Sequence, residues 1–124
     1  MTEELKIYYA HPTRMYNQID ENDTLNIIHT YYDNIGYHED HTIINPADVK
    51  ISDEDKIKFR GEYENFMAME RKYMFPLIDE SDIFIYDDEI PITGGVKVEL
   101  EYAKEIEIEI ITISELNKRL NEGD

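Results

Sequence analysis

A glycine pair followed by a glutamate is the polar pattern with the clearest chemical meaning in the sequence. Gly94 and Gly95 follow Thr93, and Glu99 comes shortly after them in a run whose apolar residues recur at helical spacing. Glycines at a helix start leave backbone N–H groups free and add no bulk, which suits an anionic or sugar ligand. We expect Glu99 to lie in about the first turn, where the helix dipole would keep it ionised. An ordinary strand-to-helix turn explains the glycine pair equally well.

A second polar segment follows the first apolar run, Leu5–Ala10. His11, Thr13 and Arg14 lie just beyond it, and an arginine at this place could hold a carboxylate or a phosphate through two parallel hydrogen bonds. His11 and Thr13 would then be further donors to the same group. A surface ion pair between Arg14 and one of the many acidic side chains is an equal alternative.

The elements that must position these residues alternate between strands and helices. Short apolar runs predict strands over Leu5–Ala10, Thr42–Asn45, Ile83–Tyr86 and Ile106–Ile113. Helical spacing and capping residues predict helices over about Asp20–Ile35, from Val96 to Ala103, and after the cap Ser114. A further helical region begins at the N-cap Ser52 and follows an apolar stripe between Ile57 and Leu77, with a break near Gly61 or Pro76. We therefore predict one α/β domain over residues 1–124, a three-layer sandwich with a central, mostly parallel sheet of four to five strands, Rossmann-like or flavodoxin-like.

This architecture predicts where a ligand would bind. In open parallel sheets the ligand lies beyond the carboxyl ends of the strands. Three segments meet that condition, namely His11–Arg14, Asp87–Gly95 and the loop after Asn45.

Composition excludes several classes of protein. The 12 Lys and Arg residues face 29 Asp and Glu residues, a net charge of -17, so that binding to nucleic acid or to an anionic membrane surface is not expected. The absence of cysteine excludes disulfides, thiolate metal sites and cysteine nucleophiles. No apolar run has membrane-spanning length and the N-terminal residues lack a signal-peptide pattern, so we expect a soluble, cytoplasmic protein.

Two further clusters could suggest a metal. The first holds two imidazoles and two carboxylates in a row but lacks a known zinc spacing, which favours a solvated loop: His38, Glu39, Asp40 and His41. The second is acidic, as in the Mg²⁺ pocket of response-regulator receivers, and consists of Asp82, Asp87, Asp88 and Glu89. Receivers need two acids just after the first strand to hold the metal, and His11–Arg14 occupies that place here. Tyr31, Tyr32 and Tyr37 are interpreted as core-edge or subunit contacts.

Three blocks of the sequence resemble one enzyme family. They read IYYAHPTR near the start, SDIFIY in the middle and TGGVKVELEYA near the end. Their order and spacing are similar to those of the nucleoside 2-deoxyribosyltransferase superfamily, which includes the nucleoside 5′-monophosphate N-glycosidases. The resemblance spans roughly Leu5 to Ile113, although only the three blocks are specific.

The resemblance implies roles for individual residues. Glu99 matches the family's nucleophile in its G-V-x-x-E pattern, and Tyr8 matches an aromatic position near the sugar and base. Arg14 matches a phosphate-binding arginine, and Thr93 matches a hydroxyl residue typical of the monophosphate hydrolases. The amides of Gly94 and Gly95 would assist at the phosphate.

Other positions depart from the family pattern. His11 and Pro12 replace a small glycine after the first strand, and Glu101 replaces a glycine two residues after the nucleophile, where it could crowd or recharge the pocket. The acid that must protonate the departing base has no direct counterpart. The candidates for it are Glu70, Asp87 and Asp88.

The expected activity is therefore cleavage of the N-glycosidic bond of a nucleoside 5′-monophosphate or deoxynucleoside, by hydrolysis or base transfer, through Glu99. No metal or organic cofactor is implied. Family members complete their sites across a subunit interface, which implies a homodimer or larger assembly with Ser114 or Asn117 as the group lent by the partner. A nucleotide-binding or sensor module without turnover is the alternative from another class, and an interaction protein with a vestigial pocket is a third.

Overall fold

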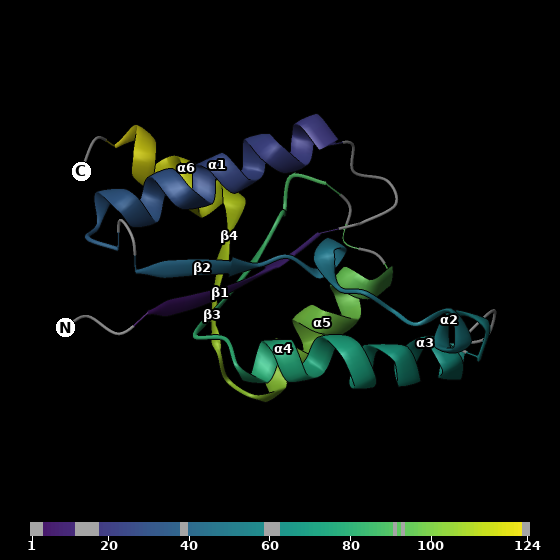
Figure 1. Cartoon of the computed structure of the whole chain (residues 1–124). Helices are drawn as coiled ribbons and strands as arrows, with labels where there is room; N and C mark the ends of the chain where they lie inside the picture. The colour runs from purple at the N-terminus through teal and green to yellow at the C-terminus, as the bar shows by residue number, and fades with distance from the viewer. Residues whose placement is uncertain are drawn as a thin grey trace.

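Four parallel strands form the middle layer of the molecule, seen in a computed structural model that describes residues 4–11, 18–37, 40–58, 63–90, 92 and 94–122 (Figure 1). The strands are β1 (Leu5–Ala10), β2 (His41–Ile44), β3 (Ile83–Tyr86) and β4 (Glu109–Thr112), in the order β2-β1-β3-β4. All three strand pairs are parallel. The predicted α/β class and mostly parallel sheet are confirmed.

Helices cover both faces of this sheet. The α1 (Gln18–Asn34) and α6 (Ile113–Asn121) helices lie on one face, and α4 (Phe75–Asp79) and α5 (Gly94–Glu105) on the other (Figure 1). A 3₁₀ turn η1 (Pro46–Asp48) and the helices α2 (Asp53–Lys58) and α3 (Tyr63–Met69) follow β2, and a π-helical turn η2 (Glu70–Met74) joins α3 to α4. Each helix in the described part of the chain is too short or too polar to cross a bilayer.

The alternation of side chains along β1 divides the core in two. Ile7 and Tyr9 pack with α1 and α6, whereas Tyr8 and Ala10 pack with α4 and α5. All four side chains are buried, as expected for a central strand covered on both faces. This alternation sends Tyr8 into the layer that holds Glu99.

The register brings the carboxyl ends of the strands to one edge. Ala10 pairs with Tyr86, and Tyr86 pairs with Thr112. The chain continues from this edge into His11, Asp87 and α6 respectively. The segments predicted to flank a ligand after β1 and β3 therefore begin side by side.

Several predicted boundaries are wrong at the C-terminal end of the sheet. The strand predicted over Ile106–Ile113 is only β4, because α5 runs to Glu105 and the chain then turns through Glu107, which has a φ of 60°. The cap of α6 is Thr112 and not Ser114, since the Thr112 hydroxyl accepts the N–H of Glu115 at 3.1 Å.

The apolar stripe after Ser52 is also only partly correct. Ser52 does cap α2, because its hydroxyl accepts the N–H of Asp55 at 3.2 Å. Ile57, which the stripe predicted to be buried, is 69% exposed. Pro76 lies in the first turn of α4, which begins at Phe75. The helix changes from α to π geometry earlier, at η2, and Gly61 lies outside the described residues. The change at η2 begins at Glu70, one of the candidate acids.

Candidate active site

Tyr8 and Glu99 form the first contact of the candidate site. Tyr8 is fully buried on β1, with its ring stacked on Phe84 at 5.6 Å between centroids. Its hydroxyl donates to Oε1 of Glu99 at 2.6 Å, the short distance typical of a charge-assisted bond. Glu99 lies on the second turn of α5 and is 5% exposed, so this contact joins the sheet to the helix inside the core.

Glu70 brings a second carboxyl group to the same place. It is the first residue of η2, is 3% exposed and is hydrogen-bonded to Glu99. Its Oε2 atom is buried without a hydrogen-bond partner among the described residues. Single π-helical turns inside α-helices are frequent at functional sites, and here one starts at the residue that meets Glu99.

The electrostatics of this carboxyl pair favour a bound proton. Burial and the neighbouring charge of Glu99 raise the pKa of Glu70. Burial also raises the pKa of Glu99, while hydrogen bonds from Glu70 and Tyr8 and the charge of His11 oppose that rise. Glu99 thus receives the contacts that favour its ionised form, and Glu70 is the member of the pair that keeps a proton more readily.

The sequence led us to expect that the helix dipole would keep Glu99 ionised. Burial of Glu99 acts against its ionisation. Glu99 lies beyond the first turn of α5, where the dipole acts most strongly, and burial is the largest cause of its raised pKa. Tyr8 remains a phenol, because burial and the charge of Glu99 both raise the pKa of its hydroxyl. The group as a whole is a phenol, a carboxylic acid and a carboxylate in one buried chain of hydrogen bonds.

Gly95 permits the close approach of the two carboxyl groups. A Cβ atom at this position would lie 3.0 Å from Oε1 of Glu70 and 3.2 Å from Oε2 of Glu99. Gly94 serves the backbone instead, since its φ is 56° and the space around it is open. The sequence predicted space for a ligand at this glycine pair. At Gly95 the carboxyl groups of Glu70 and Glu99 occupy that space.

His11 is held inside the molecule. Its Nε2 lies 2.8 Å from Oε2 of Glu21 on α1, and its Nδ1 lies 3.2 Å from the carbonyl oxygen of Tyr9. The ring also stacks on that of Tyr9, with centroids 4.2 Å apart, and the side chain is fully buried. The sequence did not identify Glu21. Nothing in the sequence of α1 distinguishes the acidic residue that contacts the end of β1 from those that face solvent.

The other acid candidates have structural contacts. Asp87 is buried and accepts the N–H of Glu89 at 2.9 Å, in the turn after β3. Asp88 accepts the N–H of Ser114 at 3.0 Å, at the start of α6. Of the three candidate acids, Glu70 is therefore the one that contacts Glu99 among the described residues.

The remaining predicted residues divide into two groups. Thr13, Arg14 and Thr93 lie outside the described residues. Ser114 is exposed and Asn117 half-buried on α6, across the sheet from α5.

The histidine cluster around β2 does not form a metal site in the described residues. His38 and Glu39 lie outside them, and no group of three or more His, Asp or Glu side chains that could hold a metal is found in the rest. His41 Nε2 lies 2.7 Å from His29 Nδ1, and His41 Nδ1 lies 2.7 Å from the carbonyl oxygen of Tyr37. Of the three tyrosines predicted to be core-edge or subunit contacts, Tyr31 and Tyr37 do lie at the core edge, whereas Tyr32 is buried in the core.

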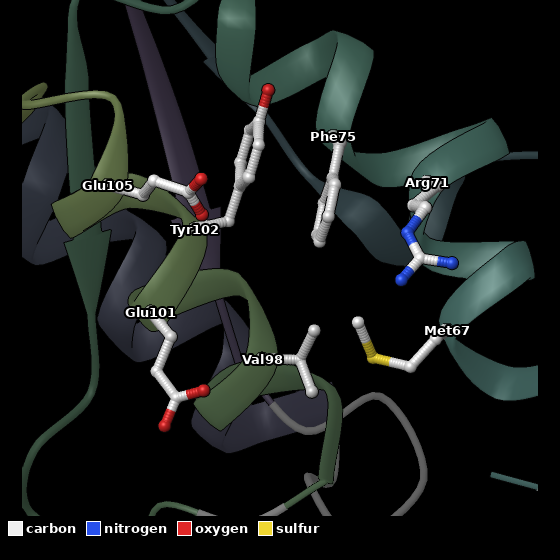
Figure 2. Close-up of a pocket in the computed structure, with 7 residues that line it drawn as sticks. All are labelled: Met67, Arg71, Phe75, Val98, Glu101, Tyr102 and Glu105. Carbon is white, nitrogen blue, oxygen red and sulfur yellow. The ribbon is translucent and has the colours of Figure 1, made fainter. Parts of the chain in front are cut away.

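A separate groove of about 430 Å³ lies on the outer side of the helices that carry the carboxyl pair (Figure 2). The stacked rings of Phe75 and Tyr102, 3.9 Å apart, form one end of it. Its lining is Met67, Arg71, Phe75, Val98, Glu101, Tyr102 and Glu105. Glu101 thus faces this outer groove, and the expectation that it crowds or recharges the carboxyl site is not met.

The chain was also compared with known proteins. No family model, curated protein or solved structure matches it.

Proposed function

We propose that the protein cleaves the N-glycosidic bond of a nucleoside 5′-monophosphate or deoxynucleoside, with Glu99 as nucleophile and Glu70 as general acid. The observation that carries the proposal is the buried contact of Glu70, Glu99 and Tyr8. Glycosidic cleavage with a covalent intermediate uses one protonated and one ionised carboxyl group on either side of the bond, so the two groups, in contact here, would have to separate to admit the substrate.

The chemistry assigns one role to each group. A carboxylate oxygen of Glu99 forms a bond to the anomeric carbon as the bond to the base nitrogen breaks, and the departing electron pair takes the proton of Glu70. Water then attacks the anomeric carbon, gives a proton to the Glu70 carboxylate and releases Glu99. In base transfer, a second base replaces the water. Tyr8 holds Glu99 in place and stabilises its charge through the hydroxyl.

The unpartnered Oε2 of Glu70 supports the assignment of the acid. A buried carboxyl oxygen without a partner is costly. An N–H group of the base would satisfy this oxygen, and protonation of the departing base would need the proton that Glu70 donates to Glu99 to move to Oε2. No metal or organic cofactor is required by this route.

The substrate class rests on the resemblance. Arg14, Thr93 and the amides of Gly94 and Gly95 would hold a 5′-phosphate, which places the anomeric carbon within reach of Glu99. By the same resemblance, the protein acts as a homodimer or larger homo-oligomer, with Ser114 or Asn117 lent to the neighbouring site. A cytoplasmic location, where nucleotides are abundant, completes the proposal.

The test is release of free base from a panel of nucleosides and nucleoside monophosphates, with and without a second free base, followed by chromatography. Wild type should release base and Glu99→Gln should not. Glu101→Gln is the matched control, because it removes the same charge from the outer side of the same helix. Arg14→Ala should lower release from monophosphates and not from nucleosides.

The other outcomes of this experiment are equally informative. Tight binding of a nucleotide without release would favour the sensor function. Neither binding nor release would show that the carboxyl pair has no role toward this class of substrate.

A further inference from the structure

A second pocket opens at the amino ends of the strands, the opposite edge of the sheet from His11. Its volume is about 280 Å³, and its lining includes Leu5, Ile83 and Glu109, the first residues of β1, β3 and β4. Residues at the end of α1 and Arg119 of α6 complete the walls. This volume is slightly below the usual range for drug-sized ligands, so the pocket fits a smaller molecule.

Tyr32 lines this pocket and carries a polar atom without a partner. Its side chain is 2% exposed, and its hydroxyl oxygen has no hydrogen-bond partner among the described residues. Burial raises the pKa of Tyr32, so the group is a phenol with a proton to donate. A buried polar group without a partner is costly. A ligand that offers an acceptor at this hydroxyl would therefore gain affinity.

Two further donors line the pocket with Tyr32. Arg119 donates from Nη1 to the Tyr31 hydroxyl at 2.9 Å and from Nε to Glu115 at 3.1 Å, and its Nη2 atom has no hydrogen bond to a described residue. The Tyr31 oxygen accepts from Arg119, so its own proton remains available to donate. The rings of Tyr31 and Tyr32 meet edge to face, with centroids 5.0 Å apart. A carboxylate can accept from several such donors at once.

The other walls of the pocket are acidic and apolar. Asp82 and Glu109 are exposed at the amino ends of β3 and β4, where they would repel a simple anion and attract an ammonium group. Ile35, Ile83 and Ile111 supply apolar surface, and Ile35 is 46% exposed, so part of this surface is open to solvent. The lining therefore suits a small molecule with both charges and an apolar body.

We propose that this pocket binds a free α-amino acid with an apolar side chain. Its carboxylate accepts from the two tyrosine hydroxyls and Arg119, and its ammonium group is held by Glu109 and Asp82. Its side chain packs against the isoleucines. The site is independent of the proposed glycosidic cleavage, since its lining includes neither member of the carboxyl pair.

Tyr32→Phe is the primary variant, because it removes only the unpartnered oxygen. Without ligand, its Tm should equal or exceed that of wild type, since the lost hydroxyl has no partner, while its affinity for leucine should fall about tenfold. Arg119→Gln and Glu109→Gln each remove a charge that the ligand needs, and each should weaken binding tenfold or more. Lys118→Gln is the matched control, because Lys118 is exposed on the same helix and lies outside the pocket lining.

The measurement is titration of the full-length protein with leucine, methionine and phenylalanine, followed by ¹H–¹⁵N NMR. We expect saturable shifts at the amides of pocket residues such as Ile35 and Glu109, retained in Lys118→Gln. N-acetyl-leucine lacks the ammonium group and leucine amide lacks the carboxylate, so both should bind at least tenfold more weakly than leucine.

Three results would overturn the inference. The first is the absence of a saturable shift with all three amino acids. The second is equal binding of leucine and either derivative, which would show that the pocket does not read both charges. The third is a lower Tm in Tyr32→Phe with unchanged affinity for leucine, which would show that the hydroxyl has a structural role.

Discussion

Asp55 and Glu99 each accept a hydrogen bond from a tyrosine hydroxyl, and their other partners differ. Asp55 on α2 accepts from Tyr73, and the ammonium group of Lys72 donates to the same oxygen at 2.7 Å. Glu99 on α5 accepts from Tyr8, and its other partner is the carboxyl group of Glu70. The π-helical turn η2 supplies Lys72 and Tyr73 to the first group and Glu70 to the second.

The difference sets a structural carboxylate apart from the one that we propose to be reactive. Hydrogen bonds from Lys72 and then from Tyr73 lower the pKa of Asp55, so that this group stays ionised. Burial without a lysine or arginine raises the pKa values of Glu70 and Glu99, so that one proton is retained between them. The first group joins α2 to η2, and the second stores a proton where a substrate could take it.

The largest difference between the two groups should appear when the carboxylate itself is neutralised. Glu99→Gln should abolish base release, on the order of 10⁴-fold or more, as expected for loss of a nucleophile. Asp55→Asn should leave base release within about twofold of wild type, because Asp55 contacts Lys72 and Tyr73 and not the carboxyl pair. Equal losses of activity in the two variants, with both folded by circular dichroism, would remove the distinction.

Neutralising the proton donor is expected to have the next largest effect. Glu70→Gln keeps the size of the side chain but removes the acid, and kcat should fall by roughly 10² to 10⁴. Nucleosides with a better leaving base need less protonation, so they should lose less activity. A uniform loss across leaving bases, measured as kcat over such a series, would show that Glu70 does not protonate the base.

The two tyrosine hydroxyls provide a finer comparison. Tyr8→Phe removes a hydrogen bond to a buried carboxylate, which should lower kcat/KM by about 10- to 100-fold. Tyr73→Phe should lower the Tm slightly and leave kcat/KM unchanged, since Tyr73 contacts the structural carboxylate. Loss of activity in Tyr73→Phe comparable to that in Tyr8→Phe would contradict the account.

Gly95 tests whether the close contact of the carboxyl groups matters. Gly95→Ala places a Cβ against both carboxyl groups, so they must move apart by a few tenths of an ångström, and we expect about a tenfold loss of kcat and about 1–3 kcal/mol of stability. Gly94→Asn is the control, because asparagine tolerates the left-handed φ at Gly94 and the space there is open. Activity and thermal unfolding should separate the two variants, and wild-type activity in Gly95→Ala would count against a tight carboxyl contact.

The smallest expected effect is on the pH dependence of stability, where the two groups act in opposite directions. The pKa of Glu70 is raised from 4.5, so the folded chain binds more protons than the unfolded chain above that pH and stability falls as the pH rises to the folded pKa. The pKa of Asp55 is lowered from 3.8, so the stability it contributes is lost as the pH falls below that value.

Thermal unfolding at several pH values, at constant ionic strength, measures both limbs. Glu70→Gln should flatten the loss of stability toward neutral and higher pH, and Asp55→Asn should flatten the loss in acid. A Glu70→Gln profile parallel to that of wild type would show that Glu70 titrates as an ordinary exposed glutamate.

The sequence predicts the parts of this molecule that depend on local pattern. Apolar runs and helical spacing identify β1, β3 and α5 closely, because each has one consistent period over its length. The parallel-sheet rule then brings Tyr8 and Glu99 toward the same region. It cannot predict that they are hydrogen-bonded, since that depends on the depth to which α5 packs on the sheet.

The rest of the site depends on tertiary contacts. The π-helical turn that begins at Glu70 has no local composition that distinguishes it from an α-helix, so the sequence offered Glu70 only as one of three acids. Glu21 meets His11 across ten residues of chain, and no periodicity links them. β4 is shorter than its alternating sequence because the preceding turn at Glu107 takes up part of the run.

The central claim is that Glu70 and Glu99 share one proton at neutral pH, and ¹³C NMR of glutamate carboxyl carbons tests it most directly. Wild type should show one protonated carboxyl resonance at neutral pH, which disappears in Glu70→Gln, together with an ionised resonance that disappears in Glu99→Gln. If every glutamate carboxyl in wild type instead titrates near the ordinary value of about 4.3, the pair holds no proton and the account of the site is wrong.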